Sequence, residues 1–279
     1  MKLAFVDLDY TVLVNPFWPA VFPYFARHVA AQSPSLPTAE AVIEDLMRRS
    51  RALVRGGDVA ATDWDRLMSE GAAGFDVTWS EPVVALVEQH RDHARTIDGA
   101  HDMLAALRRA GWTCVAASAG YRRFQLPSLR HLGLLDCFDG LRFADDAGTP
   151  KSHLAFYGSI PKTVTHVASI GDSYVEDCLY PARFGFTAIW FTGARRSQPI
   201  GCGSAPHAHV QRLEHVADAL RAATPTRGWS YRAPAGVPCP ECGGPGSHDE
   251  ACALCRCVAH GRHEAWDGSW PPDRRPLSG

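Results

Sequence analysis

Short apolar runs recur along the chain, and each run ends at a small or acidic residue. Continuous apolar runs of this length are typical of strands that are buried on both faces of a parallel sheet. The runs cover residues 3–6, 113–117, 167–170 and 187–191. Helical patterns separate and follow them, at residues 101–110, 122–135, 177–184 and 215–223. This alternation predicts an α/β fold, a Rossmann-like parallel sheet with helices on both faces.

Residues 15–95 interrupt this alternation. They contain helical stretches, such as residues 39–54 and 60–72, and no convincing strand. We therefore expect a helical insertion after the first strand. Residues 1–14 and 96–223 are then expected to form the α/β core.

The composition changes again after residue 223. Residues 224–238 are rich in Pro and Gly, which predicts a linker. Residues 239–265 contain five of the nine cysteines, and residues 266–279 form a Pro-, Gly- and Arg-rich tail that we expect to be flexible. The C-terminal part of the chain is thus expected to be separate from the α/β core.

The clustered cysteines have the spacing of a zinc site. Cys239 and Cys242 form one CxxC pair, and Cys252 and Cys255 form another. Each such turn can present two thiolates to one tetrahedral Zn²⁺, and the start of the cluster resembles a zinc ribbon. A redox-active thiol pair and a disulfide clip are the rival interpretations. The alternative zinc ligands are Cys257, His248, His260 and His263.

Charge and hydropathy bear on two classes of partner, nucleic acid and membranes, although a local basic patch is not excluded. The formal net charge of the 279 residues is −2, so no global basic field attracts nucleic acid or an anionic membrane. The most apolar window, residues 12–31, is interrupted by prolines and polar side chains, so no membrane span is expected. The first residues read as a strand rather than as a signal peptide, and the scattered cysteines fit a reducing compartment. We therefore expect a cytoplasmic protein.

Polar residues follow the predicted strands at their carboxyl ends. Such ends meet at one edge of an open parallel sheet, so these side chains are candidates for a single site. Converging carboxylates would repel each other unless a hard cation such as Mg²⁺ lay between them, and a Lys and hydroxyls beside that cation would suit a phosphate group. An Asp held there could attack phosphorus. The candidates are Asp7, Asp9, Thr11, Ser118, Asp172 and Asp177, with Lys151 ahead of the run at 167–170.

These residues resemble, in order, the motifs of the haloacid dehalogenase superfamily. DLDYT at residues 7–11 resembles the first motif, DxDx[TV], and Ser118 at the end of TCVAAS resembles the second. Lys151 in GTPKSHLAFY resembles the third, and GDSYVED at residues 171–177 resembles the fourth. The resemblance covers roughly residues 1–222, and the helical insertion corresponds to the family's cap domain.

The resemblance implies a Mg²⁺-dependent phosphatase that works through an aspartyl-phosphate. Asp7 would be the nucleophile and a Mg²⁺ ligand. Asp9 would be the general acid and base and would add its backbone carbonyl to the metal. Asp172 would bind Mg²⁺, and Asp177 would support it through water or by orienting Lys151. Asp9 also favours phosphoryl transfer over dehalogenation, because the dehalogenases of this superfamily lack an acid there.

The remaining motif residues would bind the phosphate. Ser118, Ala119 and Lys151 would hold the phosphoryl oxygens, and Thr11 would fix the loop. Each has an alternative: Ser118 could be a simple turn residue, and Lys162 lies closer to the run at 167–170 than Lys151 does. Asp177 could merely favour the first turn of a helix.

The substrate is not specified by the motifs. Tyr10 stands where many related phosphatases have Gly, and this bulky residue could narrow the site. A group of aromatic residues at the start of the insertion could be either core or substrate contact: Phe17, Trp18, Phe22, Tyr24 and Phe25.

A small-molecule phosphomonoester is the expected partner. The zinc module could add a nucleic-acid or protein partner, and no membrane is expected. The alternative functions are a phosphotransferase or mutase of the same superfamily, and a zinc-ribbon adaptor on this scaffold, possibly acting on nucleic-acid ends.

Overall fold

The computed structural model describes residues 1–193 and 208–223. The linker predicted at 224–238, the zinc module with Cys239, Cys242, Cys252 and Cys255, and the predicted tail at 266–279 lie outside the described residues. These predictions therefore stay predictions from the sequence.

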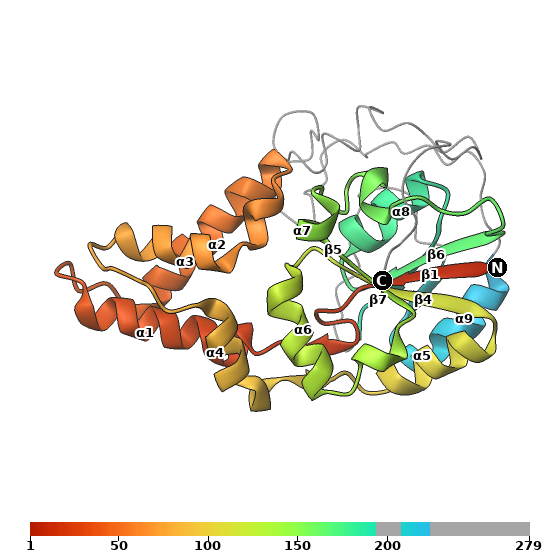
Figure 1. The fold of residues 1–279 in the computed structure, drawn as a ribbon, viewed down its shortest axis with the longest axis horizontal. Coiled ribbons are helices and arrows are strands. Elements are labelled where there is room, and N and C mark those ends of the chain that lie inside the picture. The colour runs from red at the N-terminus through yellow and green to blue at the C-terminus, as the bar shows by residue number, and fades with distance from the viewer. Residues whose placement is uncertain (194–207, 224–279) are drawn as a thin grey trace.

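A parallel sheet of six strands forms the centre of the molecule, in the order β5-β4-β1-β6-β7-β8 (Figure 1). The α/β fold with a parallel sheet that the sequence predicted is confirmed. The strands of the sheet are β1 (Lys2–Val6), β4 (Trp112–Ser118), β5 (Gly140–Phe143), β6 (His166–Gly171), β7 (Thr187–Phe191) and β8 (Ala208–Val210). The four apolar runs correspond to β1, β4, β6 and β7.

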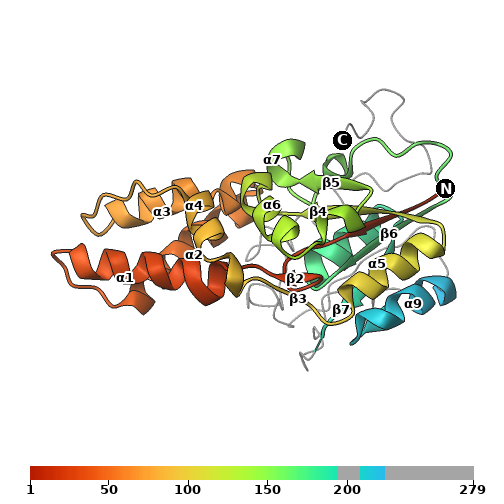
Figure 2. The ribbon, with the colours of Figure 1, turned by 60° about the horizontal axis from the view of Figure 1, so that its bottom comes forward.

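Helices pack on both faces of the sheet, because alternate residues of each strand point to opposite sides. Leu3 and Phe5 of β1 belong to one buried cluster, while Ala4 and Val6 belong to another. The second cluster includes α5 and α9, which lie side by side in both views (Figures 1 and 2). The helices of the α/β part are α5 (Ala100–Arg109), α6 (Arg122–His131), α7 (Ala144–Ala147), α8 (Tyr180–Arg183) and α9 (Val216–Ala222).

Four further helices stand apart from the sheet, and we call the segment that contains them, residues 15–94, the cap (Figures 1 and 2). They are α1 (Phe22–Gln32), α2 (Ala39–Gly56), α3 (Trp64–Ala73) and α4 (Val83–Gln89). Helix α2 shows why they form: the Thr38 side chain accepts a hydrogen bond from the Ala41 N–H at its start, and Gly57 ends it with a φ of 69°. The cap shares a buried apolar cluster with Tyr121 and Phe124, at and just beyond the start of α6.

A short antiparallel pair joins the cap to the core. It consists of β2 (Leu13–Val14) and β3 (Arg95–Thr96). The sequence showed no convincing strand between residues 15 and 95, and that interpretation was wrong at Arg95, where β3 begins. Two residues are too few to show the alternation of polar and apolar positions by which strands are found.

Two predicted helices differ from the structure. The helix expected at 122–135 ends at His131, because Gly133 has a φ of 64° and turns the chain out of the helix. The helix expected at 177–184 starts earlier, as a π-helical turn at Tyr174–Leu179 that continues into α8. Among the described residues, no helix is both long enough and apolar enough to cross a membrane.

Candidate active site

The loop after β1 is a tight turn that places two carboxylates at the edge of the sheet. The carbonyl of Leu8 accepts hydrogen bonds from the N–H groups of Thr11, Val12 and Leu13, at 2.9–3.2 Å. Tyr10 has a φ of 59°, which is uncommon for a residue other than Gly and costs roughly 1–2 kcal/mol. The turn is therefore held tightly enough to tolerate a strained residue beside the candidate nucleophile.

Lys151 connects two carboxylates in a buried ion network. Its ammonium group donates to Asp7 Oδ1 at 2.8 Å and to Asp177 Oδ1. Burial alone would lower the pKa of Lys151, but the charges of Asp177 and Asp7 raise it well above its ordinary value. Lys151 is only 2% exposed and stays protonated. By contrast, Lys162 is exposed, so the structure brings Lys151 rather than its competitor into the site.

Thr11 links the first and fourth sequence motifs. Its hydroxyl donates to Asp7 Oδ2 at 3.2 Å, and its oxygen accepts from the Asp172 N–H at 3.0 Å. The residue is fully buried. Thr11 therefore orients Asp7 and fixes the start of the loop that carries Asp172.

Gly171 makes room for Asp177. A Cβ atom on Gly171 would lie 2.2 Å from the Asp177 carboxyl group, which is closer than any real contact. With that space free, Asp177 Oδ2 accepts from the Ser173 N–H at 3.0 Å while Oδ1 accepts from Lys151. Both oxygens of Asp177 are thus in use.

Three carboxylates could hold a divalent cation. One oxygen from each of Asp7, Asp172 and Asp177 lies within 4.8 Å of the other two. Asp7 and Asp177 share the Lys151 ammonium group, and carboxylate oxygens of this kind suit Mg²⁺. The residues fit a magnesium ion.

Asp9 is held separately, by a residue that sequence reasoning missed. The Gln125 side-chain amide donates to Asp9 Oδ2 at 2.6 Å and accepts from Asn15 at 3.2 Å. Loss of surrounding water and then the charge of Asp7 raise the pKa of Asp9 to about 7, although the hydrogen bond from Gln125 opposes the shift. In the sequence, Gln125 is one polar residue within a predicted helix, which is a weak signal. The structure shows that it is buried, at 3% exposure.

The second motif contributes a turn at the end of β4. Ser118 Oγ accepts from the Gly120 N–H at 3.0 Å, which leaves its proton available to another oxygen. The carbonyl of Ala119 accepts from the Thr62 hydroxyl of the cap at 2.8 Å. Ser118 is therefore part of a turn, and this position is compatible with a phosphate contact.

These side chains open into a cleft of about 240 Å³ between the core and the cap. The buried residues Thr11 and Lys151 do not line it, whereas six other predicted site residues do: Asp7, Asp9, Ser118, Ala119, Asp172 and Asp177. Tyr10 and four further aromatic residues also line it: Phe17, Trp18, Phe22 and Trp64.

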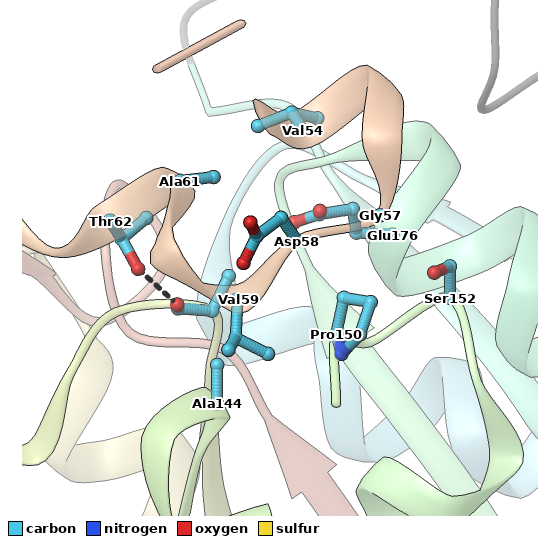
Figure 3. A pocket seen from close by; sticks show the side chains of 11 residues that line it. Val54, Gly57, Asp58, Val59, Ala61, Thr62, Ala144, Pro150, Ser152 and Glu176 are labelled. Atoms are coloured by element: carbon cyan, nitrogen blue, oxygen red, sulfur yellow. Dashed lines mark hydrogen bonds between the residues drawn. The ribbon is translucent and has the colours of Figure 1, made fainter. Parts of the chain in front are cut away.

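A smaller pocket lies beside this cleft, where the cap meets the core (Figure 3). Val59 and Thr62 border it on the cap side, and Pro150 and Ser152 border it on the core side. Its volume of about 40 Å³ has room for a few water molecules rather than for a substrate. The larger cleft is therefore the candidate active site.

Comparisons with known proteins agree with this geometry. Residues 1–185 match the family of haloacid dehalogenase-like hydrolases. The chain belongs to this family. A search of curated proteins found no match.

Solved structures of the family have the same fold. A HAD phosphatase from Thermococcus onnurineus is similar with a TM-score of 0.64 and 19% identity over 81% of this chain and 100% of that one. The HAD-hydrolase YfnB from Bacillus subtilis, whose structure contains magnesium, gives 0.58 and 18% over 79% and 98%. L-2-haloacid dehalogenase from Xanthobacter autotrophicus gives 0.54 and 16% over 80% and 100%. At these identities the likeness establishes the fold, and the reaction has to be argued from the site.

Proposed function

We propose that this hydrolase is a Mg²⁺-dependent phosphatase that cleaves phosphomonoesters through an aspartyl-phosphate on Asp7. The observation that carries the proposal is the second carboxyl group in the cleft. Asp9 lies beside Asp7 but is held by Gln125, apart from the network of Asp7, Lys151 and Asp177. A carboxyl group placed this way can exchange protons with a leaving oxygen, which an alkyl halide does not need.

The first half of the reaction follows from these positions. A carboxylate oxygen of Asp7 attacks phosphorus, and the bond from phosphorus to the leaving oxygen breaks. Asp9 gives its proton to that oxygen, so the alcohol leaves uncharged. Lys151 and the hydroxyl of Ser118 offer donors to the phosphoryl oxygens.

The second half restores the enzyme. Asp9, now a carboxylate, takes a proton from water as the water oxygen attacks phosphorus. The bond from phosphorus to Asp7 breaks, and Asp7 returns as a carboxylate with inorganic phosphate as the product.

The cation would be held by Asp7 and Asp172, with the Asp9 backbone carbonyl that the family resemblance implies. When bound, Mg²⁺ would offset the repulsion between the phosphate and the surrounding carboxylates. Both oxygens of Asp177 already accept hydrogen bonds. The contact between Asp177 and Lys151 supports a role for Asp177 in orienting that lysine.

The test is phosphate release from 4-nitrophenyl phosphate with magnesium. We expect Asp7→Asn to abolish release while the far-ultraviolet circular dichroism stays unchanged. Asp76→Asn is the matched control, because Asp76 is exposed in the cap and has a φ of 57°, which Asn tolerates. Full activity of Asp7→Asn would refute the mechanism. A phosphorylated alcohol as the product, when a competing alcohol is present, would reassign the chain as a phosphotransferase.

A further inference from the structure

The wall of the cleft contains an aromatic cluster from the cap and its entrance. We call Phe17, Trp18, Phe22 and Trp64 the aromatic wall. The ring centroids of Trp18 and Phe22 are 5.2 Å apart, and those of Phe22 and Trp64 are 4.9 Å apart, both edge to face. Phe17 packs on Phe22 at 5.2 Å. The rings support one another, so the wall is a packed surface rather than a set of separate side chains.

Trp18 is the part of this wall that a ligand can cover. Phe17 and Phe22 are buried at 6% and 1% exposure, whereas Trp18 is 48% exposed. An indole ring that lines a cleft and retains this much accessible surface has apolar area left to bury. A flat ring of a ligand would use that area better than a hydroxylated sugar chain would.

The charges around the cleft restrict the ligand further. Among the described residues that line it, none is Lys, Arg or His. Besides the predicted site residues, the lining includes one more carboxyl group, that of Glu176. Arg123, at the start of α6, already pairs with Asp63 at 2.6 Å and Asp65 at 3.1 Å. A second anionic group on the substrate would therefore meet carboxylates and, among the described lining residues, no cation to pair with.

The size of the cleft points the same way. Its volume of about 240 Å³ is below the roughly 300–1,000 Å³ that is typical of sites for drug-sized ligands. A leaving group with one ring system fits this scale better than a polymer does.

We infer that the substrate class of this site is the monophosphate ester of a small, planar aromatic alcohol that carries no second anionic group. The inference rests on the proposed phosphatase function. In this arrangement the phosphate lies against Asp7 and Ser118, and the aromatic ring lies against Trp18 and Trp64.

The first test compares two leaving groups of similar size and similar acidity. Benzyl phosphate is planar at its ring, and cyclohexylmethyl phosphate is not. We expect kcat/KM to be about tenfold higher for benzyl phosphate, because only its ring can stack on the indoles. Equal values would overturn the inference and leave the phosphatase function intact.

A second pair of compounds tests the charge. 4-Carboxybenzyl phosphate carries the extra anion, and 4-carbamoylbenzyl phosphate is its neutral counterpart. We expect the carboxylate to lower kcat/KM by roughly tenfold, with a smaller difference at high salt, where repulsion is screened. Preference for the carboxylate would contradict the inference.

Two variants identify the surface that discriminates. In Trp18→Leu the ratio of kcat/KM between benzyl and cyclohexylmethyl phosphate should fall toward one. Trp112→Leu is the matched control, because Trp112 is a half-buried Trp in β4 that does not line the cleft. It should keep the wild-type ratio, and an unchanged ratio in Trp18→Leu would refute the assignment of Trp18.

A binding measurement separates the inference from the proposed function. Benzylphosphonate and cyclohexylmethylphosphonate cannot be hydrolysed, and their affinities are measured by calorimetry in the presence of magnesium. Tighter binding of benzylphosphonate by about tenfold would support the substrate class even if no phosphate ester were cleaved. Absence of cleavage for all four esters and for 4-nitrophenyl phosphate would refute the phosphatase proposal, whereas equal binding of the two phosphonates would refute the substrate class.

Discussion

The two sides of the cleft are built in different ways. The core side is a network of buried polar groups, in which Asp7, Thr11, Lys151 and Asp177 are joined by hydrogen bonds and ion pairs. The cap side is the aromatic wall, in which Trp18 and Trp64 pack edge to face on Phe22 and Trp18 stays exposed. The hydrogen bond from Thr62 to Ala119 connects the two sides.

This difference separates chemistry from selection. Buried charges have strict geometric requirements, because an unpaired charge in the interior is costly. Apolar contacts tolerate changes of shape and size at lower cost. The core side can therefore keep one reaction, while the cap side can adapt to a particular leaving group.

The strongest way to break the core side is to remove its cation. Lys151→Met would leave the buried carboxylates of Asp7 and Asp177 without their common positive charge, and we expect a loss of roughly 3–5 kcal/mol in the free energy of unfolding, together with loss of activity. The measurement is urea denaturation in magnesium-free buffer. Lys162→Met is the matched control, and because Lys162 is exposed its effect should stay within about 0.5 kcal/mol. Similar effects for the two variants would mean that the network contributes little to stability.

The next largest effect should come from Gly171. In Gly171→Ala the new Cβ would displace the Asp177 carboxyl group from Lys151, which should cost about 1–3 kcal/mol of stability and most of the phosphatase activity. Gly140→Ala is the control, because its Cβ would meet Val115 at an ordinary 3.5 Å. Thermal unfolding and phosphate release are measured for both. A fully active Gly171→Ala would show that the position of Asp177 is not needed.

The sequence predicted those parts of the site in which a polar residue directly follows an apolar strand. The loops after β1, β4 and β6 follow apolar runs, so the amino-acid pattern alone places their polar residues at one edge of the sheet. Lys151 is favoured over Lys162 because the residues around it match a motif, and the structure brings it to Asp7 at 2.8 Å. Buried charged residues such as Asp7 and Lys151 are therefore recognisable from the sequence pattern around them.

Other parts left a weak pattern or none. The edge strands β5 and β8 were not predicted. An edge strand pairs with only one neighbouring strand, so it is less buried and needs no continuous apolar run. Gln125 lies 116 residues from Asp9, and an isolated polar residue in a helix does not indicate its partner. Only tertiary packing decides which aromatic residues of the insertion line the cleft and which belong to the core: Trp18 lines the cleft, and Phe25 is fully buried.

Gln125 tests where the core side ends, since its helix α6 also contacts the cap. Gln125→Met keeps the length of the side chain but loses the donor to Asp9. A hydrogen bond to a charged group contributes about 1.5–3 kcal/mol, so kcat should fall roughly ten- to hundredfold while KM changes less. Ser128→Ala is the control in the same helix, because its buried hydroxyl has no partner among the described residues. A change in KM alone would place Gln125 with the selecting side instead.

The smallest effect is expected from replacing one residue with a positive φ on each side of the cleft, Tyr10 on the core side and Leu36 in the cap. Tyr10→Gly relieves a φ of 59° but increases the freedom of the unfolded chain, so stability should rise by about 0–1 kcal/mol. Leu36→Gly is the matched variant in the cap, with a φ of 49° and 79% exposure, and it should give a similar change in thermal unfolding. Of these two residues, Tyr10 lines the cleft and Leu36 does not, so only Tyr10→Gly should alter KM. If Tyr10→Gly destabilises the protein while Leu36→Gly does not, the Tyr10 side chain contributes contacts that outweigh its backbone strain.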